Sequence, residues 1–217
     1  SIQAGRRVSF NKPQLEVLND AQIWEIFEDS QQNLWIGTRN NGLFRLGALR
    51  SDVQRYELNG DFIYTVFEDS RGRIWVGTIG AGLHRLYTDG SYSVYDEFSN
   101  NFILDIHEDE EGRLWIATNG GGLHRFNPES SEFITYTQED GLPNNVVYGI
   151  QPDTSGNYWM GSNYGLIQFD PEVMDFKVYT AADGLPGNEF NGKAFAAAAD
   201  GRLYFGGADG VVYFLPE

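Results

Sequence analysis

Carboxylates are the most abundant side chains in this sequence that could take part in chemistry. The 217 residues include 31 Asp and Glu against 15 Lys and Arg, which gives a formal net charge of -16. Glycoside hydrolases use two carboxyl groups about 5 to 9.5 Å apart as acid, base or nucleophile. Glu25 and Asp105 are the candidates for such a pair, because both fall on segments that are expected to line the interior.

The three histidines do not form a pattern typical of a metal site. His84 and His124 occupy the same position in two repeats, His107 lies elsewhere, and there is no cysteine. A zinc site needs three or four converging ligands, and a calcium loop needs more oxygen ligands than any cluster here supplies. Nucleophile elbows, phosphate-binding loops and zinc-protease motifs are absent as well. We therefore expect no cofactor, no metal and no catalytic activity of this chain.

The composition also argues against two classes of partner. A net charge of -16 repels the phosphates of nucleic acid and of anionic lipid headgroups. No apolar run approaches the roughly 20 residues that a membrane helix needs, so we expect no direct membrane insertion of this chain. The sequence starts at Ser1 without an initiator methionine or a signal peptide, as expected for an excerpt of something longer or a processed chain.

A repeated motif determines where these residues must lie. Five aromatic-centred segments, each preceded by an acidic turn and followed by Gly-Leu or Gly-Val, are spaced 40, 40, 44 and 45 residues apart. Each unit contains short β-prone runs separated by tight turns, with no helical periodicity. Four strands in about 40 residues is the size of a propeller blade. The central aromatic residues are Trp35, Trp75, Trp115, Trp159 and Tyr204.

We predict an all-β protein, a β-propeller of five four-stranded antiparallel blades of about 40 to 45 residues, in one domain spanning residues 1–217. The last unit holds only three strands, and Val8-Ser9-Phe10 resembles the missing fourth strand. Residues 6–10 are therefore expected to complete the fifth blade and close the ring, which removes the exposed sheet edges. The blades are expected at about residues 20–58, 61–98, 101–138, 145–182 and 190–217.

The residues that recur in every blade have structural explanations. An aromatic residue in each repeat is expected in the core between blades. The turn residues Asp29, Asp69, Asp109, Asp153 and Asp200 are expected to accept hydrogen bonds from nearby backbone N–H groups.

Non-repeated residues on the loops are better candidates for function. We expect one face to carry the loops that lead into the first strand of each blade and the loops between the second and third strands. Amide, aromatic and charged side chains there suit a polar ligand such as an oligosaccharide. Glu25, Thr65 and Asp105 hold equivalent first-strand positions and are expected to face a central channel. The candidate ligand-binding residues are Asn19, Trp24, Arg39, Asn40, Asp61, Tyr64, Asn101, Asn119, Asn145, Asn163, Tyr164, Asn188 and Asn191.

The repeat resembles that of the two-component regulator propeller family. It follows the pattern Glu-Asp-Ser-x-Gly-x-Ile/Leu-Trp-Ile/Val-Gly-Thr, then Gly-Gly-Leu-x-Arg, and Asp-Gly-Leu-Pro at 140–143 and 183–186 is similar to the family's linker between blades. The resemblance implies a periplasmic or otherwise extracytoplasmic sensor region of a bacterial signalling protein. It also implies an adjoining signalling domain as a partner.

The resemblance favours a non-catalytic sensory module that binds a small polar ligand. Two alternatives stay open on the residues alone. One is a propeller enzyme such as a polysaccharide lyase or glycoside hydrolase, since the blades also distantly resemble those of streptogramin lyase. The other is a scaffold for protein docking, because propellers of one fold serve many functions.

Overall fold

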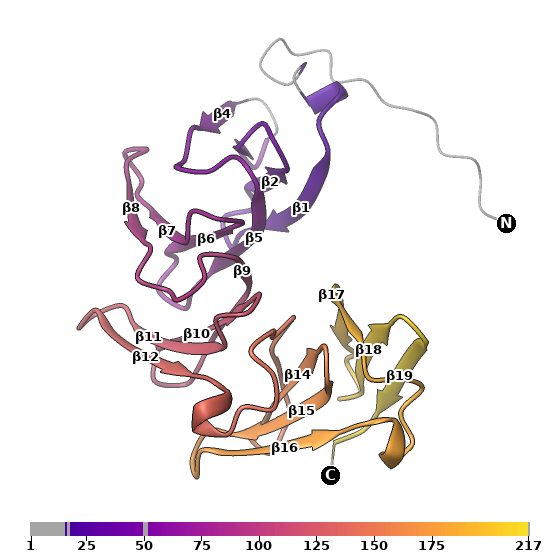
Figure 1. Ribbon diagram of the computed structural model, residues 1–217. Coiled ribbons are helices and arrows are strands. Elements are labelled where there is room, and N and C mark those ends of the chain that lie inside the picture. Colours follow the sequence, from indigo (N-terminus) through magenta and orange to yellow (C-terminus); the bar gives the residue numbers. More distant parts are fainter. Residues whose placement is uncertain (1–15, 17, 50–51, 217) are drawn as a thin grey trace, which may run out of the picture.

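The computed structural model describes residues 16, 18–49 and 52–216, which form five antiparallel sheets in sequence order (Figure 1). The predicted all-β, five-bladed propeller is confirmed. Within the described residues the fifth sheet has three strands. Residues 6–10, predicted as its fourth strand, lie outside the described part of the chain.

The first three blades each have four strands. Blade 1 consists of β1 (Ile23–Glu28), β2 (Leu34–Thr38), β3 (Leu43–Leu46) and β4 (Val53–Tyr56). Blade 2 consists of β5 (Ile63–Glu68), β6 (Ile74–Thr78), β7 (Leu83–Leu86) and β8 (Tyr92–Tyr95). Blade 3 consists of β9 (Ile103–Glu108), β10 (Leu114–Thr118), β11 (Leu123–Asn127) and β12 (Glu132–Tyr136).

Short 3-10 turns precede the last two blades. Blade 4 consists of β13 (Gln151–Pro152), β14 (Tyr158–Ser162), β15 (Gly165–Asp170) and β16 (Asp175–Tyr179). Blade 5 consists of β17 (Phe190–Ala197), β18 (Leu203–Gly207) and β19 (Gly210–Phe214). The turns are η2 (Gln138–Asp140) and η3 (Ala181–Asp183). The first strand of each blade is the innermost, and β5 lies between β1 and β9 (Figure 1).

A buried carboxylate joins the first turn of a blade to its central tryptophan. In blade 2, Asp69 Oδ2 accepts a hydrogen bond of 2.7 Å from the Trp75 indole N–H. Its Oδ1 accepts from the backbone N–H groups of Arg71 and Arg73 at 3.0 and 2.9 Å. Burial alone would raise the pKa of Asp69, but these hydrogen bonds hold it below its usual value. The turn and the core are thereby fixed together.

The same bond recurs in the other three tryptophan blades and is lost where the tryptophan is lost. The Asp–Trp distances are 2.8, 3.0 and 2.9 Å in blades 1, 3 and 4. In blade 5 the turn begins at Ala198, whose backbone N–H donates to the Arg202 carbonyl. In blade 2 the Asp69 N–H donates to the Arg73 carbonyl in the same way. Asp200 therefore lies in the turn but two residues away from the position of Asp69. Tyr204, which lacks an indole N–H, stands in place of the tryptophan.

Close packing between blades and a turn hydrogen bond explain the two residues that end the motif, which are Gly77 and Thr78 in blade 2. A Cβ atom on Gly77 would lie 2.6 Å from Ile103 in the next blade, so only glycine lets the inner strand approach this closely. The next residue, Thr78, donates its hydroxyl to the Gly82 carbonyl at 2.8 Å and closes the turn to β7. These two contacts explain the Gly-Thr that ends the motif.

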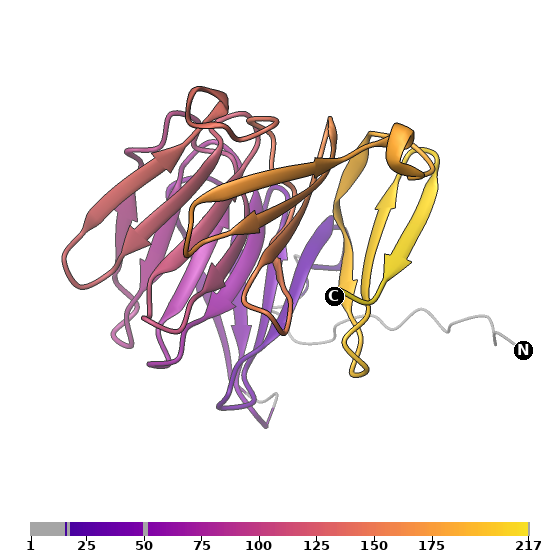
Figure 2. The same ribbon diagram turned by 90° about the horizontal axis from the view of Figure 1, so that it is seen from below.

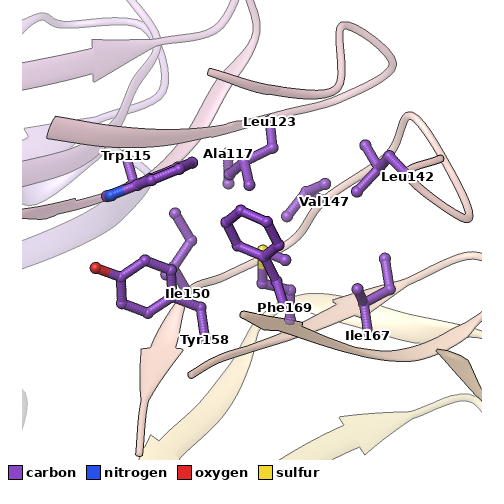
Figure 3. Close-up of a cluster of buried hydrophobic side chains, with 10 residues drawn as sticks. Trp115, Ala117, Leu123, Leu142, Val147, Ile150, Tyr158, Ile167 and Phe169 are labelled. Atoms are coloured by element: carbon purple, nitrogen blue, oxygen red, sulfur yellow. The ribbon is translucent and has the colours of Figure 1, made fainter. Parts of the chain in front are cut away.

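The core consists of the junctions between neighbouring blades. At the junction of blades 3 and 4, Trp115 and Leu123 pack against Val147, Ile150 and Phe169 (Figure 3). The linker contributes as well, because Leu142 from the Asp-Gly-Leu-Pro segment is buried in the same cluster. The predicted core tryptophans are all buried, whereas Tyr204 in the last blade is only half-buried.

Replacing Trp75 by Ala should destabilise the fold by about 3 to 5 kcal/mol, because it empties a fully buried site between blades 2 and 3 and leaves Asp69 without its indole donor. Urea unfolding measures the loss. Tyr204→Ala, at the equivalent place in blade 5, should cost less than half as much. Equal losses in the two variants would contradict this assignment of the core.

Candidate functional site

The two predicted loop sets lie together on one face. The loop between the second and third strands of each blade is bonded to the segment that leads into a first strand. Arg39 N–H bonds the Gln22 carbonyl at 2.9 Å, and Ile79 N–H bonds the Phe62 carbonyl at 3.0 Å. Asn119 N–H bonds the Phe102 carbonyl at 3.0 Å in the same way. We call this surface the loop face.

Several of the candidate asparagines hold the loop face together. The carbonyl oxygens of Asn101 and Asn145 each accept two backbone N–H groups from the preceding blade, and that of Asn188 accepts Gly165 N–H at 2.7 Å. The side chains of Asn145 and Asn188 accept Gln138 N–H at 2.9 Å and Ala181 N–H at 2.7 Å. These three residues therefore have structural partners, which reduces what they can offer to a ligand.

The other predicted ligand-binding residues differ in how exposed their side chains are. Asn19 is half-buried in a short 3-10 turn before β1. The remaining residues are exposed on the loop face and available to solvent: Asn40, Asp61, Asn119, Asn163, Tyr164 and Asn191.

An aromatic plate lies where the inner strands of blades 1 and 2 meet. Trp24 contacts Phe62 edge-on with ring centroids 5.3 Å apart, and it contacts Tyr64 at 5.8 Å. The guanidinium carbon of Arg39 lies 5.7 Å from the centre of the Phe62 ring. Trp24 and Arg39 are exposed, and Arg39 forms no ion pair with a described residue. The structure thus brings three predicted residues, Trp24, Arg39 and Tyr64, into one patch around Phe62.

A lysine from the last blade reaches the first blade beside this plate. Lys193 on β17 forms an ion pair with Glu25 on β1, and its ammonium lies 5.2 Å from the centre of the Tyr64 ring. Burial raises the pKa of Glu25, and the charge of Lys193 partly offsets that rise. A Cβ on Gly192 would collide with the Tyr64 hydroxyl, so glycine there lets β17 approach β5. Strands β1, β5 and β17 therefore meet at this point.

The backbone of Lys193 is strained. Its φ is +63°, a left-handed conformation that residues other than glycine seldom adopt. The strain coincides with a break in the pairing of β17 with β18 between Phe190 and Phe195. Residues held in such conformations often lie at functional sites, where the surroundings keep them in place.

Asp105 lies on the inner strand β9 and bridges blades 3 and 4. Its Oδ2 accepts the Ile150 N–H at 2.8 Å. Burial raises the pKa of Asp105 to about 7, against the opposing effects of that hydrogen bond and of Lys193. Thr65, the third predicted channel residue, is buried on β5. Asp105 and Glu25 thus accept hydrogen bonds from different donors, whereas the charges of Lys193 and Glu25 both act on the pKa of Asp105.

Tyr64 and Tyr148 complete the wall of this region. Burial is the main reason that the pKa of Tyr64 rises to about 12, and Tyr148 and Asp105 add to the rise. Tyr148 donates its hydroxyl to Asn163 Oδ1 at 2.7 Å. We call the group formed by Trp24, Phe62, Tyr64, Glu25 and Lys193, with Arg39, Tyr148 and Asn163 around it, the channel-mouth site.

Three members of this site were missed in the sequence: Phe62, Tyr148 and Lys193. Both aromatic residues did carry a signal, because Phe62 before β5 matches Phe102 before β9, and Tyr148 holds in blade 4 the position of Trp24 and Tyr64. Lys193 does carry a signal, because it is a cation beside a glycine in an otherwise apolar inner strand. Its partner Glu25 is 168 residues away, which no local pattern indicates.

Two of the three histidines, His84 and His124, belong to the buried core. His84 and His124 are fully buried, and His124 Nδ1 lies 2.9 Å from the Thr135 hydroxyl. Burial lowers the pKa of His124 to about 4, so its ring is neutral at physiological pH. Among the described residues no group of His, Cys, Asp or Glu could hold a metal ion.

A concavity lies away from the loop face. It has a volume of about 650 Å³ between blades 3 and 4, at the turns that join first and second strands. Its lining is rich in carboxylates, including Glu108, Glu110, Asp153 and Glu172, with Arg113 among them. The loop residues predicted to bind ligand do not line it.

No helix in the described part of the chain is long and apolar enough to cross a membrane.

Comparison with known proteins identifies the repeat. Four segments match the family model of the two component regulator propeller, at residues 17–40, 57–80, 97–120 and 141–164. Each segment runs from the loop before a blade's first strand to the loop after its central strand. The predicted resemblance is thus confirmed. None of the curated proteins matches the sequence.

Solved structures with this fold include bacterial sensors and lyases. The extracellular domain of the hybrid two component system BT3049 from B. thetaiotaomicron is 26% identical, with a TM-score of 0.81 over 91% of this chain and 28% of its own. That of BT4673 from the same organism is 25% identical, with a TM-score of 0.79 over 91% and 30%. Virginiamycin B lyase from Staphylococcus aureus, at 16% identity and a TM-score of 0.72 over 90% and 70%, shares the fold alone. The chain spans under a third of the sensor domains.

Asp105 should make stability depend on pH. Its pKa is about 7 in the folded protein and about 3.9 in an unfolded chain, so its protonation stabilises the fold fully below pH ~4, and that contribution is lost as the pH rises through ~7. The free energy of unfolding of the wild type should therefore fall, relative to that of Asp105→Asn, across this window. Urea unfolding at a series of pH values measures both. Parallel pH profiles for the two proteins would show that Asp105 ionises normally.

Proposed function

Because this chain is a propeller built from two component regulator repeats, we propose that it is a sensory module of a bacterial signal-transduction protein and catalyses no reaction itself. The sensors that it resembles are extracellular domains of hybrid two component systems, at 25 and 26% identity. Their location supports an extracytoplasmic or periplasmic position for this module. Their greater length supports an adjoining signalling domain as the partner that receives the signal.

The channel-mouth site is the observation that carries the ligand proposal. Exposed Trp24 and the edge of Phe62 provide apolar surface on which the face of a sugar ring can stack. Arg39, Glu25 and the exposed amide of Asn163 provide donors and acceptors around that surface. A few directed polar groups around an apolar plate are typical of sites for polar ligands. We assign a small polar ligand, of the oligosaccharide class, to this site.

The position of the site suggests how binding is transmitted. Trp24 and Glu25 belong to β1, Phe62 and Tyr64 to blade 2, and Lys193 to β17. A ligand that contacts all three favours one arrangement of the first and last blades over others, and its effect is limited by its difference in affinity between them. Such a shift would either relieve or preserve the left-handed backbone conformation of Lys193.

The enzyme alternative has less support, because its two candidate carboxylates, Glu25 and Asp105, are each held by another group. Glu25 is paired with Lys193, and Asp105 accepts the Ile150 backbone N–H. A glycoside hydrolase needs two carboxyl groups directed at one scissile bond. The lyase likeness at 16% identity concerns the fold, and the same fold serves many activities.

Binding can be tested by calorimetric titration of the chain with a panel of neutral and charged oligosaccharides. At least one should bind, and Trp24→Ala should weaken it about tenfold or more, which corresponds to about 1.4 kcal/mol of lost stacking and packing. Arg39→Ala should weaken it as well. Tyr92→Ala is the matched control, since Tyr92 is an exposed aromatic residue on β8, the last strand of blade 2, outside the site.

Two results would argue against the proposal. If no oligosaccharide of the panel binds, the ligand class is wrong. If one binds and Trp24→Ala leaves its affinity unchanged, the site lies elsewhere on the propeller. Conversion of a bound sugar to products by the wild-type chain would support the enzyme alternative instead.

A further inference from the structure

The turn side of the propeller is the end of the blades opposite the loop face. It carries the turns that join first to second and third to fourth strands, whereas the short 3-10 turns lie at the loop-face end (Figure 2). Two links tie blade 2 to blade 3 on this side. Glu108 accepts Ser70 N–H and Oγ–H at 2.6 and 2.9 Å. Glu129 forms ion pairs with Arg71 and Arg73 at 2.7 and 2.6 Å.

The serine–glutamate link is lost between blades 3 and 4. It also joins blades 1 and 2, where Glu68 accepts Ser30 N–H and Oγ–H at 2.6 and 2.7 Å. At the junction of blades 3 and 4, Glu110 occupies the position of the serine and Pro152 that of the glutamate. Proline has no side-chain acceptor and no backbone N–H. This link therefore cannot form there.

The arginine–glutamate link changes at the same junction. Glu172 of blade 4 follows Asp-Pro as Glu129 of blade 3 follows Asn-Pro, so the two glutamates are equivalent. Glu111, however, stands in blade 3 where blade 2 has Arg71. Arg113 donates to Glu111 Oε2 at 2.6 Å within its own blade. Like charges of blades 3 and 4 thus meet where opposite charges join blades 2 and 3, and like charges repel.

A gap lies where these links change. It is the acid-lined concavity of about 650 Å³ between blades 3 and 4, and Glu110, Glu111, Pro152 and Glu172 all line it. On the same side of the junction of blades 1 and 2, where the serine–glutamate link is made, the concavity has a volume of about 140 Å³. The residues that differ from the repeat are therefore those that border the larger opening.

The inner strand of blade 4 is short beside this gap. β13 has two residues, whereas β1, β5 and β9 have six each. It pairs with β14 through Gln151 and Pro152. Residues 147–150, which lead into it, form no strand, and Asp105 Oδ2 accepts the Ile150 N–H at 2.8 Å. The backbone that enters blade 4 is thus held to blade 3 by this hydrogen bond and is less committed to its own sheet.

We propose that the junction of blades 3 and 4 is a hinge, at which blade 4 rocks against blade 3 by opening and closing the gap on the turn side. Apolar side chains that include Leu142 and Val147 fill the junction toward the loop face (Figure 3), so the motion pivots there. Hinges are a few residues at the ends of elements that absorb the change in backbone angles, as residues 147–150 are placed to do. Tyr148 of the channel-mouth site lies in this segment, although the hinge does not depend on a ligand at that site.

Double electron–electron resonance between nitroxide labels on the full chain tests the hinge. The chain has no cysteine, so two introduced cysteines take up label at defined places. Ser130→Cys with Val173→Cys spans the junction of blades 3 and 4, and Thr88→Cys with Ser130→Cys spans that of blades 2 and 3. All three residues are exposed in turns between third and fourth strands. The distance distribution of the first pair should be broader than that of the second.

Exchanging charged residues between blades provides the sharper result. Glu111→Arg gives blade 3 the arginine of blade 2, so an ion pair with Glu172 replaces repulsion. The first distribution should then shift to shorter distance and narrow to the width of the second. Arg71→Glu makes the opposite exchange and should broaden the second distribution. Glu97→Arg is the control, because it makes the same charge change at an exposed residue outside the gap, and it should alter neither.

Two outcomes would overturn the hinge. One is a first distribution as narrow as the second in the labelled chain that carries no charge exchange. The other is a Glu111→Arg variant whose first distribution matches that of Glu97→Arg. Circular dichroism checks that each variant is folded, and Glu111→Gln, which removes only the repulsion, takes the place of Glu111→Arg if that variant unfolds.

Discussion

The hydrogen bond between a buried turn carboxylate and the indole N–H of the central tryptophan is the contact on which the blades depend. A carboxylate out of water is costly unless its lone pairs are satisfied, and here Asp69 accepts two backbone N–H groups besides the Trp75 indole. The same carboxylate thus sets the turn between the first two strands and the orientation of the largest core side chain. In blade 5 both partners change together, to Ala198 and Tyr204.

Stacking of blades follows from that fixed core and gives the molecule two unlike faces on every sheet. Glycine after the tryptophan lets the next inner strand approach, and isoleucine or valine on that strand fills the space. The contact with isoleucine is made at the first two junctions, whereas Ala117 replaces the glycine in blade 3 and Gly161 of blade 4 faces Phe190. Stability is then the sum of similar units and their interfaces. Equivalent positions nevertheless differ in burial among the described blades, since Ile26 is 62% exposed and Val66 is 4% exposed.

Function is expected where the repeat is broken, because the repeated residues are committed to the core. The channel-mouth site combines aromatic residues of blades 1 and 2 with the Lys193–Glu25 pair between the first and last blades. Its charges lie in a partly buried setting, where burial raises the pKa of Glu25 and brings that of Asp105 to about 7. The proposed sensory role would use this place, because a ligand bound there would touch several blades at once.

The sequence by itself determined the blade architecture, the strand order and the buried tryptophans, because these depend on contacts within 40 residues that recur in each repeat. It also indicated Trp24, Arg39 and Tyr64, which the fold brings into one patch. Only the tertiary structure decided that Lys193 meets Glu25 across 168 residues, that Asn145 and Asn188 hold turns, and that equivalent residues such as Ile26 and Val66 differ in burial. The physical reason is that burial and ion pairing depend on which blades are neighbours, and a local repeat carries no record of what lies beyond its two ends.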